Sequence, residues 1–275
     1  MTPQPIYILG AGISGLTLGR CLKSKGIPAI LFEKRESPLR HDYGIMLHSW
    51  AFKPLLKTLD MDESTFRHQL AVDTNKGSSG HIAKVSNSAS FRAHCGRFES
   101  MLREDLNIKW GHQYEHSTPI GAGRILSFKN QNQVSSKLAI DTCGVHSRTR
   151  KQLSNESQLK VVPYVVFRGT RRIPGHHFKG TYAPFFKDAT MIETRKSDTN
   201  FHISIDGYQK DSEIVDISYI YSRPARLNDD PLHRHGREKD EASKIPEDFY
   251  QEVSGLSDIE SPFEETFDVQ SMRED

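Results

Sequence analysis

The first 33 residues alternate between short apolar runs and an amphipathic stretch. Residues 6–9 are apolar and lead into a glycine-rich turn at 10–15, after which apolar side chains recur at helical spacing. Gly26 is suited to end this helix, and residues 28–32 form a second apolar run. The order predicts strand, turn, helix and strand, which is a βαβ unit.

The pattern changes at about residue 161, where runs rich in β-branched and aromatic residues begin. Pro174-Gly175 and Asp206-Gly207 are turn-forming pairs between these runs, which lie at 161–167, 190–194, 201–205 and 214–221. Short runs of this kind between turns are typical of an antiparallel sheet. Beyond residue 223 apolar residues become sparse, and a helical pattern returns only at 249–256.

The glycine-rich turn has the spacing Gly10-x-Gly12-x-x-Gly15, and Glu33 ends the following apolar run. In this pattern the first glycine makes a tight turn, the second admits a pyrophosphate to the backbone, and the third packs helix against strand. The helix N-terminus offers amide donors to phosphates, and the acid accepts hydrogen bonds from a ribose diol. The sequence therefore predicts a site for FAD or NAD, where the charge of Glu33 disfavours the 2′-phosphate of NADPH.

These patterns together predict an α/β fold class. We expect a Rossmann-like dinucleotide-binding domain over residues 1–158 and a second, mainly antiparallel β-sheet domain over residues 159–222. Residues 223–275 are predicted to form an acidic, largely flexible connector with a short helix.

Composition and charge exclude several classes of protein. The chain is 36% hydrophobic and 26% charged, and no apolar run reaches the roughly 18–20 residues of a membrane-spanning helix. We therefore expect neither a membrane span nor a wholly disordered chain. The formal net charge is +2, although seven basic and 15 acidic residues lie from Arg223 onward. The basic residues before Arg223 are dispersed, so no nucleic-acid partner is predicted.

Cysteine and histidine usage adds two expectations. Cys21, Cys95 and Cys143 are widely spaced, which is not the pattern of a disulfide framework, and no basic segment precedes the first apolar run as in a secretion signal. These features predict an intracellular, cytoplasmic protein. Histidine pairs such as His112 and His116 lack an accompanying cluster of cysteine or carboxylate ligands, so no metal site is predicted.

Four segments carry a resemblance to a known family: residues 10–15, Glu33-Lys34, residues 42–50 and residues 144–150. They resemble class A FAD-dependent monooxygenases, which have the para-hydroxybenzoate hydroxylase fold, and most of all the fungal members of secondary metabolism. The resemblance implies FAD in the N-terminal βαβ domain, a small-molecule substrate on the second domain's sheet, and NAD(P)H as co-substrate. The residues implied to bind the cofactor are Gly10, Gly12, Gly15, Glu33, Lys34, Gly44, Arg97 and Gly144.

Three features depart from the family pattern. The second fingerprint has an aspartate where this chain has Cys143, and a neutral thiol is no substitute for a charged acceptor, although Asp141 lies two residues earlier. Cys95 occupies the position at which the family has a flavin-binding arginine. Arg97 or Arg92 would then take that role, unless both are solvated surface charges. The Gly-Asp segment of the family does not occur in these 275 residues.

Two functions remain open at this level. The first is an FAD-dependent monooxygenase that hydroxylates or epoxidises a polyketide, aromatic or terpenoid-type intermediate with NAD(P)H and O2. The alternative is a truncated or degenerate relative without redox turnover, which would be a binding protein or an inactive remnant. The sequence indicates no catalytic residue and no oligomeric state.

Overall fold

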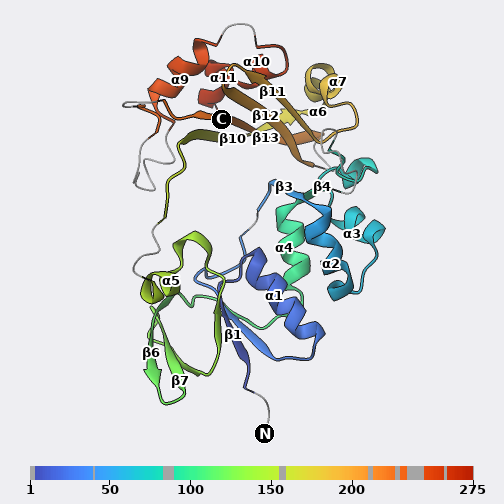
Figure 1. Ribbon diagram of the computed structural model, residues 1–275. Coiled ribbons are helices and arrows are strands. Elements are labelled where there is room, and N and C mark those ends of the chain that lie inside the picture. Colours follow the sequence, from blue (N-terminus) through green and yellow to red (C-terminus); the bar gives the residue numbers. More distant parts are fainter. Residues whose placement is uncertain are drawn as a thin grey trace. The chain divides into compact units, whose positions relative to one another are not determined.

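The computed structural model describes residues 4–39, 41–82, 90–154, 159–209, 213–226, 230–233, 245–256 and 259–274. The chain divides into two compact units (Figure 1). The first contains residues 1–41, 49–66 and 95–160, and the second contains residues 42–48, 67–94 and 161–275. The last segment of the first unit ends at residue 160, and the domain boundaries given from the sequence stay predictions. The assignment of two N-terminal segments to the second unit has no counterpart in the sequence patterns.

A parallel sheet forms the centre of the first unit. Its strand order is β5-β2-β1-β9, and every pair is parallel. Helix α1 (Ile13–Ser24) connects β1 (Ile6–Leu9) to β2 (Ala29–Phe32), as the spacing of apolar residues predicts. The other two strands, β5 (Ile108–Lys109) and β9 (Ala139–Asp141), come from much later in the sequence.

A small antiparallel sheet and further helices complete the first unit. The sheet has the order β6-β7-β8, with bounds Tyr114–Ile120, Gly123–Phe128 and Gln133–Ser136. Its apolar side chains join those of the parallel sheet in one core, where the Phe32 and Phe128 rings lie 4.5 Å apart. The helical elements are α2 (Ser49–Leu59), α4 (Cys95–Arg103), the 3₁₀ turn η2 (Gly144–His146) and α5 (Arg148–Leu153); α3 (Glu63–Leu70) crosses the boundary between the units.

The second unit is built on a four-stranded antiparallel sheet. Its order is β10-β13-β12-β11, with bounds Tyr164–Pro174, Ile214–Pro224, Thr199–Tyr208 and Met191–Lys196. A two-stranded sheet of β3 (Gly44–Leu47) and β4 (Phe91–His94) and the 3₁₀ turn η1 (Thr74–Lys76) belong to the same unit. The α/β fold class is therefore confirmed.

One face of this sheet carries the larger core of the protein. Helices pack their apolar side chains on it, among them Phe249, Phe263 and Phe267. The helical elements of this unit are α6 (Gly175–His177), the π-helix η3 (Phe178–Tyr182), α7 (Ala183–Phe186), α9 (Glu247–Ser254), α10 (Phe263–Thr266) and α11 (Val269–Glu274). The helical pattern at 249–256 thus corresponds to α9, whereas α10 and α11 had no predicted counterpart. Most of the polar segment 228–244 lies outside the described residues.

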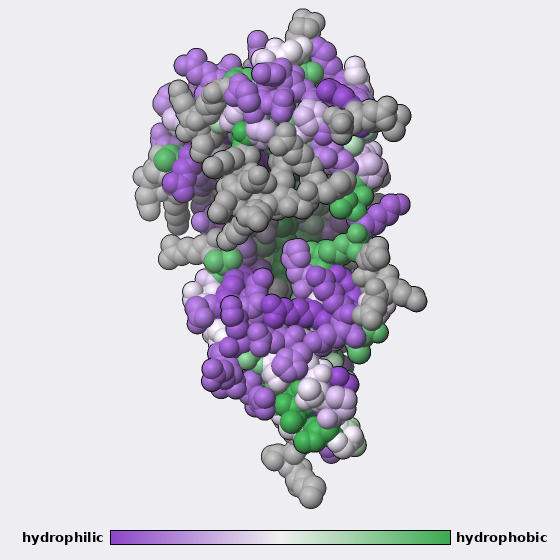
Figure 2. Space-filling model, turned by 90° about the vertical axis from the view of Figure 1, so that its left-hand side faces the viewer, coloured by the Kyte–Doolittle hydropathy of each residue, from purple (hydrophilic) through white to green (hydrophobic). Residues whose placement is uncertain are grey.

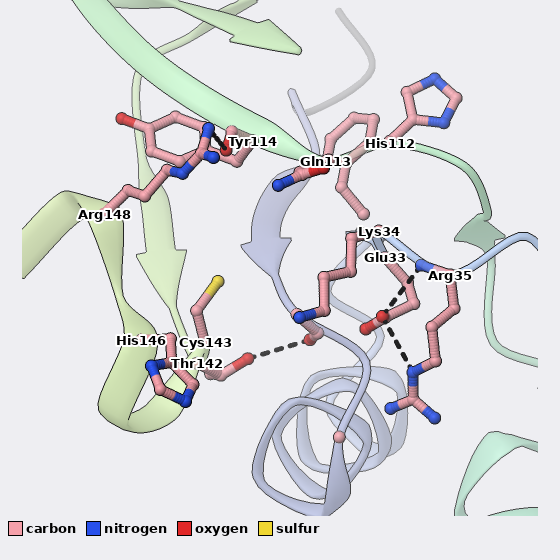
Figure 3. Close-up of a pocket in the computed structure, with 13 residues that line it drawn as sticks. Glu33, Lys34, Arg35, His112, Gln113, Tyr114, Thr142, Cys143, His146 and Arg148 are labelled. Atoms are coloured by element: carbon pink, nitrogen blue, oxygen red, sulfur yellow. Dashed lines mark hydrogen bonds and ion pairs between the residues drawn. The ribbon is translucent and has the colours of Figure 1, made fainter. Parts of the chain in front are cut away.

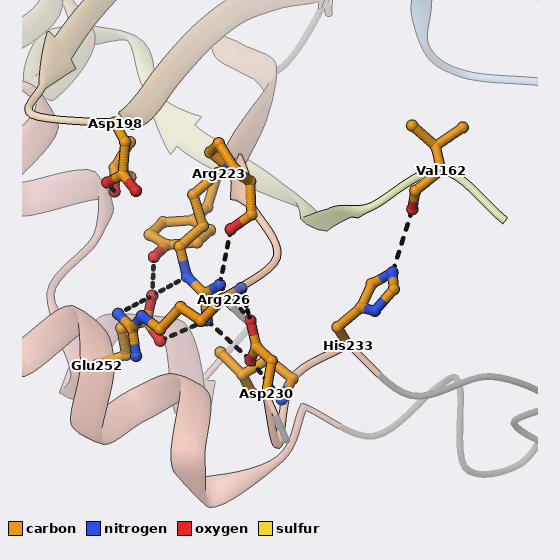
Figure 4. Close-up of polar contacts among 11 residues, drawn as sticks. Val162, Asp198, Arg223, Arg226, Asp230, His233 and Glu252 are labelled. Atoms are coloured by element: carbon orange, nitrogen blue, oxygen red, sulfur yellow. Dashed lines mark hydrogen bonds and ion pairs between the residues drawn. The ribbon is translucent and has the colours of Figure 1, made fainter. Parts of the chain in front are cut away.

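A buried ion cluster joins the end of β13 to α9. The Arg223 side chain is 1% exposed, and its guanidinium lies between Asp230 and Glu252 (Figure 4). The Arg223 Nη1 to Asp230 Oδ2 distance is 2.5 Å, and the Arg223 Nη2 to Glu252 Oε2 distance is 2.8 Å. Tyr221 also donates its hydroxyl hydrogen to Glu252. Both carboxylates therefore compensate the buried charge, which is the condition for a stable buried arginine.

The coloured part of the face shown in Figure 2 is mostly polar. Hydrophilic side chains cover most of that area, and hydrophobic side chains gather in smaller patches. None of the helices in the described residues is both long and apolar enough to cross a membrane.

Candidate functional site

The strongest candidate site is a pocket of about 430 Å³ in the first unit. It lies where β1, β2 and β9 end, which is the edge at which open parallel sheets bind their ligands. Lys34 and Arg35 enter from one side, and Cys143, His146 and Arg148 from the other (Figure 3). The described residues that line it are Gly10, Gly12, Phe32, Glu33, Lys34, Arg35, His112, Gln113, Tyr114, Thr142, Cys143, His146 and Arg148.

The turn after β1 requires glycine at two of its positions. Gly10 has φ +101°, and a Cβ there would lie 3.0 Å from the Thr142 carbonyl oxygen. A Cβ on Gly15 would lie only 2.1 Å from the carbonyl oxygen of Gly10, so the first turn of α1 packs directly on the chain before it. The Thr142 hydroxyl donates to the Gly10 carbonyl at 2.9 Å, which joins this turn to the end of β9.

Gly12 is different, because it faces open space. It is the N-cap of α1, and a Cβ built on it would meet no atom within 4 Å, although the residue lines the pocket. No side chain among the described residues caps this helix end. The amide groups of the first turn of α1, together with the helix dipole, are therefore available to a phosphate that approaches the Gly12 backbone.

Glu33 places an ionised carboxylate beside this helix end. Its Oε2 accepts the Ala11 N–H at 2.9 Å, and its Oε1 accepts both the N–H and the Nε–H of Arg35 at 3.1 Å. Burial favours the neutral acid, but these donors outweigh it, so the pKa of Glu33 lies below its ordinary value. Each oxygen of an ionised carboxylate can accept more than one hydrogen bond, so the carboxylate keeps acceptor capacity for a ligand hydroxyl.

The remaining walls are basic and aromatic. Lys34, Arg35 and Arg148 bring positive charge, and Arg148 is held by a hydrogen bond from its Nη1 to the Tyr114 carbonyl at 3.3 Å. The His112 ring lies 5.5 Å from the Phe32 ring. Its Nδ1 is 2.6 Å from the Trp110 carbonyl oxygen and its Nε2 is 3.0 Å from the Asn132 amide nitrogen. Both ring nitrogens of His112 are therefore engaged by the protein.

Cys143 occupies the wall opposite Glu33 without offering a charge. Its thiol donates to the Leu9 carbonyl at 3.3 Å, and burial together with the Asp141 charge raises its pKa to about 12. Asp141 accepts the Cys143 N–H at 2.7 Å and the Ser147 hydroxyl hydrogen, and it is not one of the pocket residues. Asp141 therefore shapes the turn that leads into α5 and does not replace the missing carboxylate.

The sequence of this chain has relatives of known class, although no protein-family model matches it. The protein nscC of Neosartorya fischeri, named FAD-dependent monooxygenase, is 26% identical over 292 residues, which cover 95% of this chain and 69% of the relative. The protein adaC of Aspergillus niger, with the same descriptive name, is 26% identical over 296 residues, which cover 99% and 70%. This chain is a relative of the FAD-dependent monooxygenases.

The solved structure of CtdE in complex with FAD has the same fold. Its TM-score is 0.62 at 14% identity, and the match covers 86% of this chain and 62% of CtdE. The chain thus spans less than two thirds of that protein. The resemblance to FAD-dependent monooxygenases inferred from sequence motifs is confirmed by these similarities.

The residues of the pocket fit the adenosine and pyrophosphate parts of FAD. The open Gly12 backbone leaves room for a phosphate group, the basic side chains match its charge, and Glu33 is an acceptor for ribose hydroxyls. Among the described residues, no group of three or more histidine, cysteine or acidic side chains could hold a metal ion.

The structure brings together some of the predicted cofactor residues. Gly10, Gly12, Glu33 and Lys34 line the pocket, and Gly15 packs directly behind it. Gly144 follows the lining residue Cys143 and opens the turn η2. Arg97 is on α4 of the same unit and is not among the lining residues.

Gly44 belongs to the second unit, where the geometry gives it a packing role. A Cβ on Gly44 would lie 2.5 Å from the Arg92 Nε, and the Gly44 N–H donates to Asp206 Oδ1 at 2.7 Å. The Arg92 Nη2 donates to the same Asp206 oxygen at 2.7 Å, and both side chains are buried. The interpretation of Arg92 as a solvated surface charge is therefore wrong, because its guanidinium is enclosed in an ion pair.

Several residues of the pocket carry no recognisable signal in the sequence. Arg35, Gln113, Tyr114 and Arg148 were not singled out, and His112 was considered only as a metal ligand. The glycine motif and Glu33 are close in sequence and could be found from spacing alone. Arg35 follows β2 directly, two residues after Glu33. The other missed residues follow β5 and β9, and only the pairing of these strands with β2 and β1 brings them to the same edge.

Proposed function

We propose that this protein is an FAD-dependent monooxygenase whose first unit holds the adenosine and pyrophosphate parts of FAD. The observation that carries the proposal is the backbone at Gly12, which opens into the pocket at the N-terminus of α1 beside the ionised Glu33. The names of the relatives nscC and adaC support the same reaction class.

Each residue of the pocket has a role in this proposal. The amides of the first turn of α1 bind the pyrophosphate, Glu33 accepts hydrogen bonds from the ribose, and Lys34 and Arg148 balance the phosphate charge. Bound FAD supplies the electron transfer and oxygen chemistry that side chains cannot perform. The predicted contacts of Gly44, Arg97 and Gly144 with the cofactor are part of the proposal and rest on the family resemblance.

The substrate and the reductant also follow from the resemblance. The protein would hydroxylate or epoxidise a small molecule of secondary metabolism, of polyketide, aromatic or terpenoid type, with O2 and NAD(P)H. The sheet of the second unit would bind that molecule. NADPH would not use the Glu33 pocket, because an ionised carboxylate repels a 2′-phosphate.

Replacement of Gly12 tests FAD binding without disturbing the fold. Gly12 has φ −78° and ψ −179°, which any residue adopts, and a side chain there meets no protein atom. We expect Gly12→Val to fold normally and to lose most of the flavin absorbance near 450 nm, with FAD affinity at least about tenfold weaker. Gly180→Ala is the matched control, because Gly180 also faces open space but lies in the second unit. A folded Gly12→Val protein with unchanged FAD affinity would contradict the proposal.

One observation favours a second candidate, a flavin-binding relative without redox turnover. The fingerprint position that carries an aspartate in the family holds Cys143, whose neutral thiol is bound to the Leu9 carbonyl. Mixing the FAD-loaded protein with NADPH under anaerobic conditions separates the two candidates. Bleaching of the flavin supports the monooxygenase, whereas bound flavin that NADPH and NADH both leave oxidised supports the second candidate.

A further inference from the structure

A second cavity, of about 250 Å³, lies entirely in the second unit. It is formed where the adjacent ends of β12 and β13 meet η1, α6 and the π-helix η3. It shares no lining residue with the nucleotide pocket. Its lining is Lys76, Gly175, Phe178, Lys179, Ala183, Tyr208, Gln209, Glu213, Ile214 and Val215.

The walls of this cavity are mainly aromatic and aliphatic. The Phe178 and Tyr208 rings lie 6.0 Å apart at an interplanar angle of 85°, and Tyr208 pairs with Val215 across the two strands. Phe178 and Val215 are buried in the core of the unit, so these walls are firmly packed. An edge-to-face pair of this kind offers flat apolar surface to an aromatic ring.

The polar part of the cavity is biased towards positive charge. Lys76 and Lys179 both line it, and the Lys76 Nζ lies 5.4 Å from the centre of the Tyr208 ring. Within the part of the chain that the structure describes, neither ammonium group forms an ion pair with a carboxylate. Among the described residues that line the cavity, Glu213 is the one carboxylate. Asp73, whose charge acts on Tyr208, accepts the Gly80 N–H at 2.7 Å. The cavity thus presents two cations against one acid.

The backbone of one wall is unusual in itself. Residues Phe178–Tyr182 form a π-helix between two short α-helical segments, and Phe178 and Lys179 are its first two residues. A π-helical turn is rare and is frequently found at functional sites. Here it places an aromatic and a basic side chain in the wall of the same cavity.

We propose that this cavity is a binding site for a small aromatic carboxylate. The ring would lie against Phe178, Tyr208 and Val215, and the carboxylate would be bound by Lys76 and Lys179. Cavities for drug-sized ligands occupy roughly 300–1,000 Å³. This one is smaller, so the ligand has a single ring. The site is independent of FAD and adds a second ligand to the proposed function.

The test measures the affinities of benzoate, the probe, and of benzamide, its uncharged analogue, by calorimetric titration of the whole protein. We expect benzoate to bind and benzamide to bind at least about tenfold more weakly, because a hydrogen bond to a charged group contributes more than one between neutral groups. The double substitution Lys76→Gln and Lys179→Gln is expected to weaken benzoate binding by about tenfold or more. Lys25→Gln with Lys129→Gln is the control of equal charge, because both lysines are exposed in the first unit.

A second variant tests the apolar part of the site. Ala183→Phe introduces a ring into the cavity and is expected to abolish benzoate binding, while the unfolding temperature and the FAD absorbance show that the protein is folded. The proposal is overturned if benzoate does not bind, if benzamide binds equally well, or if the paired lysine substitutions have no effect. Displacement of benzoate by FAD would also overturn it, because the ligand would then occupy the nucleotide pocket. FAD binding is measured separately, so this proposal and the monooxygenase proposal can fail independently.

Discussion

Glu33 is the only carboxylate among the described residues that line the nucleotide pocket. Its three protein donors keep it ionised and fix its position, so a ribose hydroxyl meets a charged acceptor that does not need to reorganise. Substitution of Glu33 is therefore the most direct test of whether the pocket binds the adenosine half of FAD.

We expect Glu33→Gln to weaken FAD binding by about tenfold, because a neutral amide is a poorer acceptor than a carboxylate. Quenching of flavin fluorescence on binding measures this affinity. The substitution also has a pH signature. The pKa of Glu33 is lower in the folded protein, so its stabilisation is present above the ordinary carboxylate pKa and is lost as the pH falls through the lowered value. The stability difference between wild type and Glu33→Gln should disappear at acid pH; Glu36→Gln, at an exposed site, is the control.

Cys143 is expected to be a poor nucleophile, because its thiol is part-buried against the Leu9 carbonyl although the residue as a whole reaches solvent. Its pKa of about 12, against 9.0 for an ordinary thiol, means that about a thousandfold less thiolate is present near neutral pH. In a protein with Cys21→Ser and Cys95→Ser, alkylation by iodoacetamide at pH 8 should be slow by about this factor relative to a free thiol. The rate should rise about tenfold per pH unit. Rapid labelling at pH 8 would show that Cys143 carries an accessible thiolate.

The ion cluster of Arg223 connects two secondary-structure elements, because its hydrogen bonds to Glu252 join β13 to α9. The hydrogen bonds from Arg223 lower the pKa of Asp230. Burial of Glu252 raises its pKa, but Arg223 and Tyr221 outweigh that effect and hold it low. Both carboxylates therefore remain charged at neutral pH, and loss of Arg223 would remove the buried cation that lies between them.

We expect Arg223→Met to lower the free energy of unfolding by about 3–5 kcal/mol. Removal of one partner of a buried ion pair leaves the other charge desolvated without that partner's attraction. Urea unfolding followed by circular dichroism measures this. Arg226→Met is the matched control, because the Arg226 side chain is 60% exposed while its Nη2 lies 3.2 Å from the same Glu252. Its loss should cost less than about 1 kcal/mol. If both substitutions lowered the free energy of unfolding equally, burial of Arg223 would not be the reason for its larger contribution.

The elements that could be predicted from sequence are those with a local signal. The βαβ unit follows from the spacing of apolar residues and glycines between residues 6 and 33, and the antiparallel sheet from runs such as 201–205. Strands β3 and β4 could not be predicted to pair, because Gly44 and His94 meet only through contacts distant in sequence. Helices α10 and α11 are short and lie among acidic residues, which obscured the apolar side chains that they bury.

The same distinction applies to the candidate site. The glycines of the first turn and Glu33 were predictable because they lie within one βαβ unit. The aromatic and basic walls around His112 and Arg148 were not, because they depend on which strands become neighbours in the sheet. A fingerprint can predict a nucleotide site, but not which side chains surround it.

For the whole molecule, we expect the two proposed ligands to protect different units. The nucleotide pocket lies within the first unit and the small cavity within the second. Saturation at about 100 times the dissociation constant stabilises the bound state by about 2.7 kcal/mol. In hydrogen exchange, FAD should therefore slow the amides after β1 and β2 most, and benzoate those at the end of β12 and the start of β13. If FAD slowed exchange elsewhere but left the exchange rates of the first unit's amides unchanged, this assignment would be contradicted.

The chain passes between the units five times, after residues 41, 48, 66, 94 and 160. This interleaving has a consequence for synthesis on the ribosome. Strand β1 is synthesised early, yet the Leu9 carbonyl accepts a hydrogen bond from the hydroxyl of Thr142, which lies 133 residues later in the chain. At roughly 5–20 residues per second, the nascent strand waits on the order of 10 s for this neighbour. During that interval one edge of β1 is open to pairing with another strand, and β9 closes that edge only after residue 141 has been synthesised.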